Sequence, residues 1–336
     1  MPDENAFGVA QNLLRERKVW AALGAFDFAE KLGYPQHECC AGRWQCWMLL
    51  GEFERAWQES DLISASGVND PHRYWDGSSW VNKRIMLRCL HGLGDTINFI
   101  RYAPLLKATC RELIVQAHPE LVTLLEKIPF LDQVVTWSPG GEDDGVPWDV
   151  QMEVNELPRV FRTVLETIPA TFPYLFIPEE RLIWASRLLQ LDGRPLIGLC
   201  WRAGPWDASR SLEVADIAPL LSVSEITFVS LQKAIEPPFR QIVDAAVHAA
   251  DVLDTAAVIA HLDMVITVDT MVAHLAGALG KPVWLLLPKA ADWRWMMDTA
   301  KSPWYPTARL FRQDNEQGWS KPINELIAEL LTLQRL

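Results

Sequence analysis

The chain has 336 residues, of which 49% are hydrophobic and 22% charged, a globular composition with more chain than one ordinary core needs. Its 31 basic and 43 acidic side chains give a net charge of −12, which argues against a nucleic-acid partner, because nucleic acids select a basic face. No apolar run reaches the roughly 18 residues of a membrane span, the acidic N-terminus is untypical of a signal peptide, and the cysteines lack zinc-type spacing. We therefore expect a cytoplasmic protein with no transmembrane segment and no zinc site.

The first segment, residues 1–70, is predicted to be helical and to contain a repeat. Three pairs of similar positions lie 34 residues apart: Val19 and Phe53, Ala22 and Ala56, and Gly33 and Gly67. This is the period of tetratricopeptide (TPR) repeats, whose helix pairs stack to bury their apolar faces. Two repeats are fewer than the usual minimum of about three, so we expect the array to lean on the next domain. Two unrelated helical hairpins are the alternative.

Residues 71–178 are predicted to form a first α/β domain. Residues 71–82 are a polar, aromatic linker with a turn at Asp76-Gly77. The expected strands are 84–90, 112–115 and 134–135, and the expected helices are 96–107 and 119–127. A glycine-rich acidic loop at 140–145 leads into an irregular stretch that ends at 178. The alternation of strands and helices predicts a parallel sheet covered by helices.

Residues 179–336 repeat this alternation and predict a second α/β domain. The expected helices are 179–191, 236–250, 255–262, 270–279 and 324–333, and the expected strands are 196–200, 225–231, 264–268 and 283–287. We expect the last helix to pack back on the first α/β domain. Two Rossmann-like, doubly wound halves place a ligand cleft between them, at the carboxyl ends of their strands.

The strongest functional signal is the junction between the strand 264–268 and the helix that follows it. Asp269 ends the strand, Thr270 is suited to cap the helix, and His274 lies one turn further on. The first amides of such a helix attract a diphosphate. We therefore predict that this junction binds the diphosphate of a nucleotide ligand, with Asp269, Thr270 and His274 as residues of the binding site. The alternative is that Thr270 only caps the helix and His274 only fills a polar edge.

A second signal joins the first strand of the first domain to its first helix, in the sequence His91-Gly92-Leu93-Gly94-Asp95. Gly92 and Gly94 let a substrate approach the backbone. Asp95, at the helix start, is placed to take a proton from an attacking hydroxyl. The alternative is that Asp95 is only an N-cap, because aspartate is a favoured capping residue.

Two further groups of polar residues follow strands of the second domain. Arg202 and Arg210 flank a glycine-containing turn and could neutralise a departing diphosphate without a metal. Gln232 and Lys233 follow the strand 225–231 and are candidates to touch the base, ribose or phosphate of the same ligand. For both pairs, simple exposure to solvent is the alternative.

At these residues the chain resembles the heptosyltransferases of glycosyltransferase family 9. Gly92-Leu93-Gly94-Asp95 resembles their N-terminal motif, and Asp269-Thr270 with His274-Leu275-Ala276-Gly277 resembles their donor-binding motif. The whole chain is similar to bacterial TPR proteins with a glycosyltransferase-like C-terminal region, most clearly from Asp269 to Pro306. Where relatives usually carry Glu-Gln before the first motif, this chain has Leu90-His91.

The resemblance implies the two-domain GT-B fold and an inverting, metal-independent transfer from a nucleotide-sugar. By the family pattern Asp95 is the base, Thr270 and His274 hold the donor's phosphates or sugar, and Asp269 supports them. A glycan, a lipid-linked acceptor or a protein acceptor is compatible with this pattern, and a protein partner through the TPR-like segment is a further expectation. The alternatives are a non-catalytic binding or scaffold protein and, less favoured, a nucleotide-sugar epimerase.

Overall fold

The computed structural model describes residues 4–68, 73–137, 145–189, 193–204, 207–314 and 318–333. The chain divides into a helical unit, made of Met1–Arg73, Pro158–Ile168 and Ala290–Trp304, and a two-sheet unit, made of Tyr74–Leu157, Pro169–Lys289 and Tyr305–Leu336. This division differs from the expected domains 1–70, 71–178 and 179–336, because two later segments join the N-terminal helices and both sheets share one unit. Residues 71–72, 140–144 and 205–206 of the predicted linker and loops lie outside the described residues.

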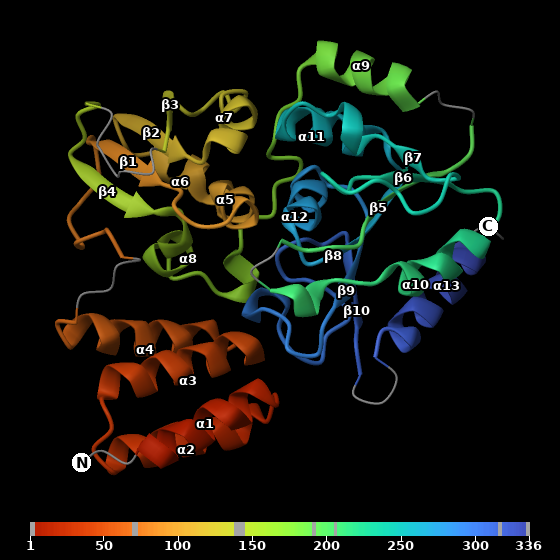
Figure 1. Ribbon diagram of the computed structural model, residues 1–336. Helices are drawn as coiled ribbons and strands as arrows, with labels where there is room; N and C mark the ends of the chain where they lie inside the picture. Colours follow the sequence, from red (N-terminus) through yellow and green to blue (C-terminus); the bar gives the residue numbers. More distant parts are fainter. Residues whose placement is uncertain are drawn as a thin grey trace. The chain divides into compact units, whose positions relative to one another are not determined.

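The described residues of the N-terminal part of the helical unit form four helices, which Figure 1 labels α1 to α4. They are α1 (Glu4–Arg15), α2 (Val19–Lys31), α3 (Gln36–Leu50) and α4 (Phe53–Ala65). Gly33 and Gly67, which we expected to close the repeated segments, have φ values of +89° and +72°, a left-handed conformation that favours glycine after a helix. The helices confirm the expected helical extension, whereas its assignment to TPR repeats stays a prediction.

Two later segments complete the helical unit. They carry most of α8 (Leu157–Val160) and the 3-10 turns η3 (Leu165–Thr167) and η7 (Trp293–Trp295). The indole of Trp57 donates to the carbonyl of Thr163 over 2.7 Å, and Phe53 stacks on Trp304 at a ring distance of 6.1 Å. The N-terminal helices therefore pack on segments that lie far along the chain.

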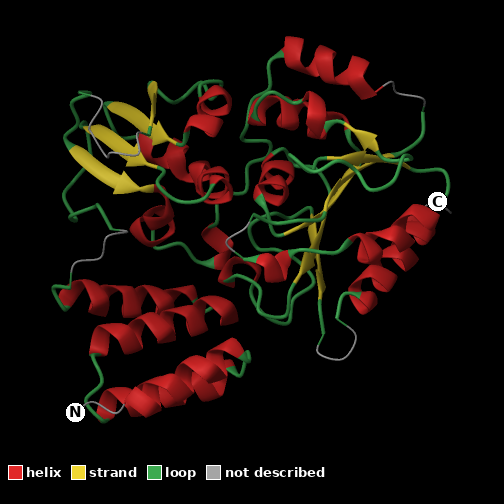
Figure 2. Cartoon of the chain, in the orientation of Figure 1, coloured by secondary structure: helices red, strands yellow, loops and turns green. Residues whose placement is uncertain are grey.

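The first sheet of the two-sheet unit has four parallel strands in the order β3-β2-β1-β4, which Figure 1 labels and Figure 2 colours yellow. They are β1 (Arg84–Arg88), β2 (Glu112–Ala117), β3 (Gln133–Thr136) and β4 (Val150–Glu153). Its helical segments are α5 (Leu93–Phe99), η1 (Ile100–Tyr102), α6 (Ala103–Lys107), α7 (Pro119–Leu125) and η2 (Val154–Glu156). The sequence missed β4, which lies in the stretch expected to be irregular.

The second sheet has six parallel strands in the order β10-β9-β8-β5-β6-β7. They are β5 (Leu196–Cys200), β6 (Thr227–Ser230), β7 (Val243–Asp244), β8 (Met264–Val268), β9 (Val283–Leu287) and β10 (Ala308–Arg312). Its helical segments are α9 (Glu179–Leu189), η4 (Ala208–Arg210), α10 (Val214–Ile217), η5 (Ala218–Ser222), η6 (Ala246–His248), α11 (Val252–His261), α12 (Met271–Ala278) and α13 (Ser320–Leu333).

Two expectations for this half are wrong. The helix expected at 236–250 is absent from these described residues, which instead hold turns, the short strand β7 and η6, because Pro237 and Pro238 break a helical run. The last helix, α13, buries Ile323, Leu326 and Leu330 in the core of the second sheet instead of crossing to the first half.

The two halves of the two-sheet unit contact each other through helices. α5 packs against α12, and α7 packs against α11 (Figure 1). Because α5 follows β1 and α12 follows β8, this contact joins the two strand-to-helix junctions that carry the sequence motifs. None of the described helices combines the length and apolar character that a membrane span requires.

Candidate functional site

The junction between β8 and α12 has the form that the sequence predicted, with one difference. Thr270 occupies the N-cap position, but its side chain makes no capping hydrogen bond. Its hydroxyl instead lies 3.3 Å from that of Thr267 and 3.8 Å from the Cys200 thiol. The first amides of α12 are therefore not capped by Thr270, and such amides are suited to bind an anion.

His274, one turn into α12, is held from both sides of its ring. Its side chain is 7% exposed, and its Nδ1 lies 3.0 Å from the Tyr305 hydroxyl. Its Nε2 lies 4.0 Å from Oδ1 of Asp269, whose side chain is 8% exposed. Sequence reasoning identified His274 and Asp269 as site residues but assigned no role to Tyr305, whose neighbours become apparent only in the fold.

Gly94 of the first half lies directly against His274 of the second. A Cβ atom at position 94 would stand 2.6 Å from Cδ2 of the imidazole, closer than real Cβ atoms come to a neighbour. Gly94 is thus required by the approach of a side chain from α12. The structure brings the His91–Asp95 loop and the Asp269–His274 segment together.

Asp95 is the third residue of α5 and not its N-cap, because the helix begins at Leu93. Its Oδ2 accepts a hydrogen bond from the Gly92 amide over 3.0 Å. This bond ties the carboxylate to the glycine loop and fixes where it lies. The half-buried side chain remains within reach of a ligand at the start of the helix.

The buried carboxyl of Glu153, which the sequence analysis did not single out, contacts the backbone just before the His91–Asp95 loop. Glu153 ends β4, its side chain is fully buried, and it accepts from the Leu90 amide over 3.4 Å. Burial raises its pKa to about 8, and the nearby Asp95 and Glu156 carboxylates add to the increase, while backbone amides oppose it. Nε2 of His91 lies 3.8 Å from the same carboxyl. The only signal in the sequence was an acidic residue at the end of a short apolar stretch.

The two arginines lie in different environments. Arg210 is largely buried, and its Nη1 donates to the carbonyl of Asp269 over 2.9 Å. Its guanidinium also lies 3.5 Å from Asp207 and 3.9 Å from the Asp269 carboxylate. Arg210 therefore stands beside the start of α12, whereas Arg202 is exposed on the loop after β5.

Gln232 and Lys233, for which we predicted contact with the ligand, both contact protein groups in this structure. Oε1 of the buried Gln232 accepts from the amides of Trp201 and Arg202 over 3.2 and 2.8 Å, so it holds the loop after β5 in place. Lys233 is exposed and pairs with Glu120 of α7 over 3.2 Å. Both contacts are with protein groups, which the sequence could not indicate.

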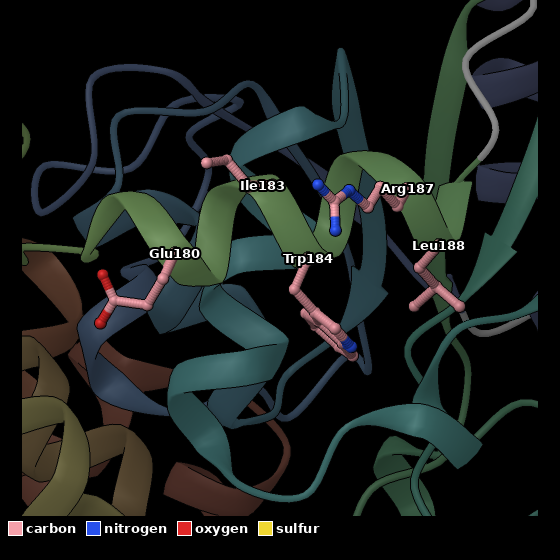
Figure 3. Close-up of a pocket in the computed structure, with 5 residues that line it drawn as sticks. All are labelled: Glu180, Ile183, Trp184, Arg187 and Leu188. Atoms are coloured by element: carbon pink, nitrogen blue, oxygen red, sulfur yellow. The ribbon is translucent and has the colours of Figure 1, made fainter.

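A separate surface depression of about 490 Å³ lies along α9, lined by Glu180, Ile183, Trp184, Arg187 and Leu188 (Figure 3). All five residues come from this one helix, and none is a site residue predicted from the sequence. Among the described residues, no group of three or more His, Cys, Asp or Glu side chains is arranged to hold a metal ion.

The segment that includes the β8–α12 junction matches a known protein family. Residues 250–317, which include β8 and α12, match glycosyltransferase family 9 (heptosyltransferase). The chain is 23% identical over 332 residues to Protein FlbA of Caulobacter vibrioides, an alignment that covers 84% of this chain and 53% of the relative. The chain thus spans about half the length of that protein.

Two solved structures share the fold. A family 9 glycosyl transferase from Veillonella parvula superposes with a TM-score of 0.59 at 14% identity, over 76% of this chain and 99% of that one. The ADP-heptose lps heptosyltransferase II of E. coli superposes with a TM-score of 0.53 at 16% identity, over 75% and 99%. The chain therefore has the GT-B fold of these two glycosyltransferases, and the region that matches family 9 includes the β8–α12 junction.

Proposed function

We propose that the chain transfers a sugar from a nucleotide-diphosphate-sugar to a hydroxyl acceptor, with inversion and without a metal. The observation that carries the proposal is the meeting of two junctions: the start of α12, with Thr270 and His274, lies against the loop that holds Asp95. One junction suits an anionic donor, and the other supplies a carboxylate for the acceptor.

On the donor side, the diphosphate lies over the first amides of α12, which Thr270 does not cap. His274 and Thr270 contact the phosphates or the sugar, and Asp269 supports His274 from 4.0 Å. Arg210 or Arg202 offsets the charge that develops on the leaving group. Gln232 acts indirectly, because its side-chain oxygen holds the loop that carries Arg202.

On the acceptor side, Asp95 acts as the general base. Its carboxylate removes the proton of the acceptor hydroxyl while that oxygen attacks the anomeric carbon. The bond from this carbon to the diphosphate oxygen breaks on the opposite face, and the nucleoside diphosphate leaves with its electron pair. A single displacement of this kind inverts the anomeric configuration. The loop glycines let the acceptor approach the backbone.

Asp95→Asn tests the assignment of the base. The variant should lose transfer by about 100-fold or more, because general-base catalysis contributes on the order of 10²–10⁴ in rate, while donor affinity stays unchanged. Asp298→Asn, at an exposed turn, is the matched control. Transfer at the wild-type rate in Asp95→Asn would remove that residue from the role.

The absence of a metal requirement is tested separately. Transfer should continue at an undiminished rate after exhaustive treatment with EDTA, because arginines and helix amides supply the positive charge near the leaving group. Loss of transfer on chelation, with recovery on adding back one divalent ion, would show a metal-dependent reaction.

A second candidate function is a binding or scaffold protein that recruits a partner through the helical unit. A groove of about 510 Å³ between α1, α2 and α3 favours it, with lining residues that include Phe7, Gln11, Glu38 and Gln45. For the transfer reaction, the proposed acceptor classes are a glycan, a lipid-linked glycan and a protein. The proposed location is the cytoplasm. Hydrolysis or transfer of a nucleotide-sugar by the purified chain would favour the enzyme over the scaffold.

A further inference from the structure

A buried cation lies behind the candidate donor site. Arg101, on η1, is 3% exposed. Its guanidinium donates to the carbonyl and side-chain oxygens of Asn98 over 2.7 and 2.9 Å and to the Tyr174 hydroxyl over 3.0 Å. Burying a charge is costly unless polar partners replace water, so a guanidinium at this depth is held by a specific arrangement.

Aromatic rings form the rest of this arrangement, and we name Phe172, Tyr174 and Tyr305 the aromatic cage. The Arg101 guanidinium carbon lies 5.5, 5.0 and 4.6 Å from their respective ring centres. Cation–π attraction at such distances is strongest where water is excluded. The cation therefore fixes the position of Tyr305, the ring that lies nearest to it.

Tyr305 in turn contacts the imidazole of the candidate site. Its hydroxyl lies 3.0 Å from Nδ1 of His274, and the two rings pack edge to face with centres 5.7 Å apart. A Cβ atom at Gly277 would stand 2.4 Å from the Tyr305 ring, so α12 has a glycine where the tyrosine passes. Arg101 thus contacts Tyr305, and Tyr305 contacts His274.

The state of the imidazole follows from the groups on its two sides. Burial raises the pKa of Tyr305 well above its ordinary value, so the hydroxyl keeps its proton and can donate it in a hydrogen bond. The Asp269 carboxylate lies on the Nε2 side, 4.0 Å away, and a nearby negative charge favours a proton on that nitrogen. A proton on Nε2 leaves Nδ1 as the acceptor for the Tyr305 hydroxyl, which is also hydrogen-bonded with Tyr174.

We propose that Arg101 and Tyr305 are positioning residues that hold His274 with Nδ1 as the hydrogen-bond acceptor and with the proton on Nε2, the nitrogen on the Asp269 side. This inference rests on the proposed function for what His274 binds, but not for the state of its ring. Because Arg101 belongs to the first half and His274 to the second, the network also links the half that carries Asp95 to the donor-binding half.

The test uses the full-length chain and a Tyr305→Phe variant, which removes the hydroxyl and keeps the ring. Long-range ¹H–¹⁵N spectra of the wild type should show His274 as the neutral tautomer protonated on Nε2. In Tyr305→Phe, the His274 Nδ1 resonance should shift, and the affinity for ADP, measured by calorimetry, should fall about three- to tenfold. Tyr34→Phe, on the helical unit, should leave both readouts at their wild-type values.

Arg101→Lys gives a second, independent variant, because it keeps the charge and loses the planar donor arrangement. It should shift the same resonance in the same direction, while a melting temperature close to wild type shows that the fold persists. Unchanged His274 resonances in Tyr305→Phe, or an imidazole protonated on Nδ1 in the wild type, would overturn the proposal. Failure of wild-type protein to bind ADP or any nucleotide-sugar would instead count against the proposed function and leave the spectroscopic test intact.

Discussion

Gly94 and Gly277 each make room for an aromatic ring from another part of the chain. A side chain at either position would meet His274 or Tyr305 at less than 3 Å. The sequence predicted that Gly94 matters, but as an opening for substrate. Its contact with a residue 180 positions away along the chain depends on how α5 meets α12, which local sequence patterns do not encode.

Gly94→Ala tests this contact at the residue scale. The added methyl group overlaps the imidazole, so we expect a loss of about 1–3 kcal/mol in the free energy of unfolding and a marked loss of transfer. Gly24→Ala, in α2, is the matched control, because nothing lies within 4 Å of the added atom. That variant should be neutral or more stable by up to about 1 kcal/mol in urea unfolding. Equal stabilities of the two variants would contradict the close approach.

Glu153 makes stability depend on pH. Burial raises its pKa from 4.5 to about 8. Between these two pH values the Glu153 carboxyl therefore keeps its proton in the folded state and has lost it in the unfolded state. The stabilisation that the protonated Glu153 carboxyl gives the folded state is fully present below about pH 4.5. It decreases by roughly 1.4 kcal/mol per unit of pH as the pH rises and is lost toward about pH 8.

Glu153→Gln removes this titration and should flatten the pH dependence of unfolding. Urea denaturation at about pH 5 and about pH 8 should show wild-type stability falling relative to the variant as the pH rises. Parallel pH profiles for the two proteins would mean that Glu153 is ionised in the folded state across this range.

At the scale of elements, the sequence predicted best those strands and helices that are buried on both sides. The strands at 196–200, 264–268 and 283–287 appear as β5, β8 and β9, because continuous apolar runs are typical of parallel strands. β4 and β10 were missed because they mix polar residues into short runs. Among the described strands, β10 pairs only with β9, and its exposed Arg309 donates to Glu329 of α13.

The loop after β5 illustrates what patterns along the chain cannot reveal. Gln232 follows β6 but holds two amides of the neighbouring loop, and this contact exists only because β5 and β6 pair in parallel. Gln232→Ala should destabilise the fold by about 1–3 kcal/mol, since it leaves the buried Trp201 amide and the partly buried Arg202 amide without this acceptor.

Lys233→Ala is the adjacent control for this prediction. Its ion pair with Glu120 is exposed, so its removal should change stability by less than about 1 kcal/mol in the same urea titration. A Gln232→Ala variant as stable as Lys233→Ala would show that the loop does not depend on that side chain.

At the scale of the whole molecule, the helical unit is not a simple N-terminal extension. Its helices contact residues 158–168 and 290–304: Trp57 binds the Thr163 carbonyl, and Arg17 binds the Ala291 carbonyl. The sequence predicted the helices and the need for further packing, but not which segments supply it. Such partners are distant in the chain and carry no periodic pattern.

Deletion of residues 1–70 should therefore destabilise the remaining protein, because residues 158–168 and 290–304 lose the helices that cover their apolar faces. We expect a lower melting temperature and aggregation of the truncated protein relative to the full chain. A truncated protein that melts as cooperatively, and at the same temperature, would show that the helices are dispensable for folding.

The central claim is that the start of α12 binds a sugar-carrying diphosphate beside Asp95. Isothermal titration calorimetry of the full chain with a panel of ADP- and UDP-sugars tests it most directly. At least one nucleotide-sugar should bind in the range of about 1 µM to 1 mM, and His274→Ala should weaken that binding about tenfold or more. No binding by any nucleotide-sugar, or binding that His274→Ala leaves unchanged, would contradict the account.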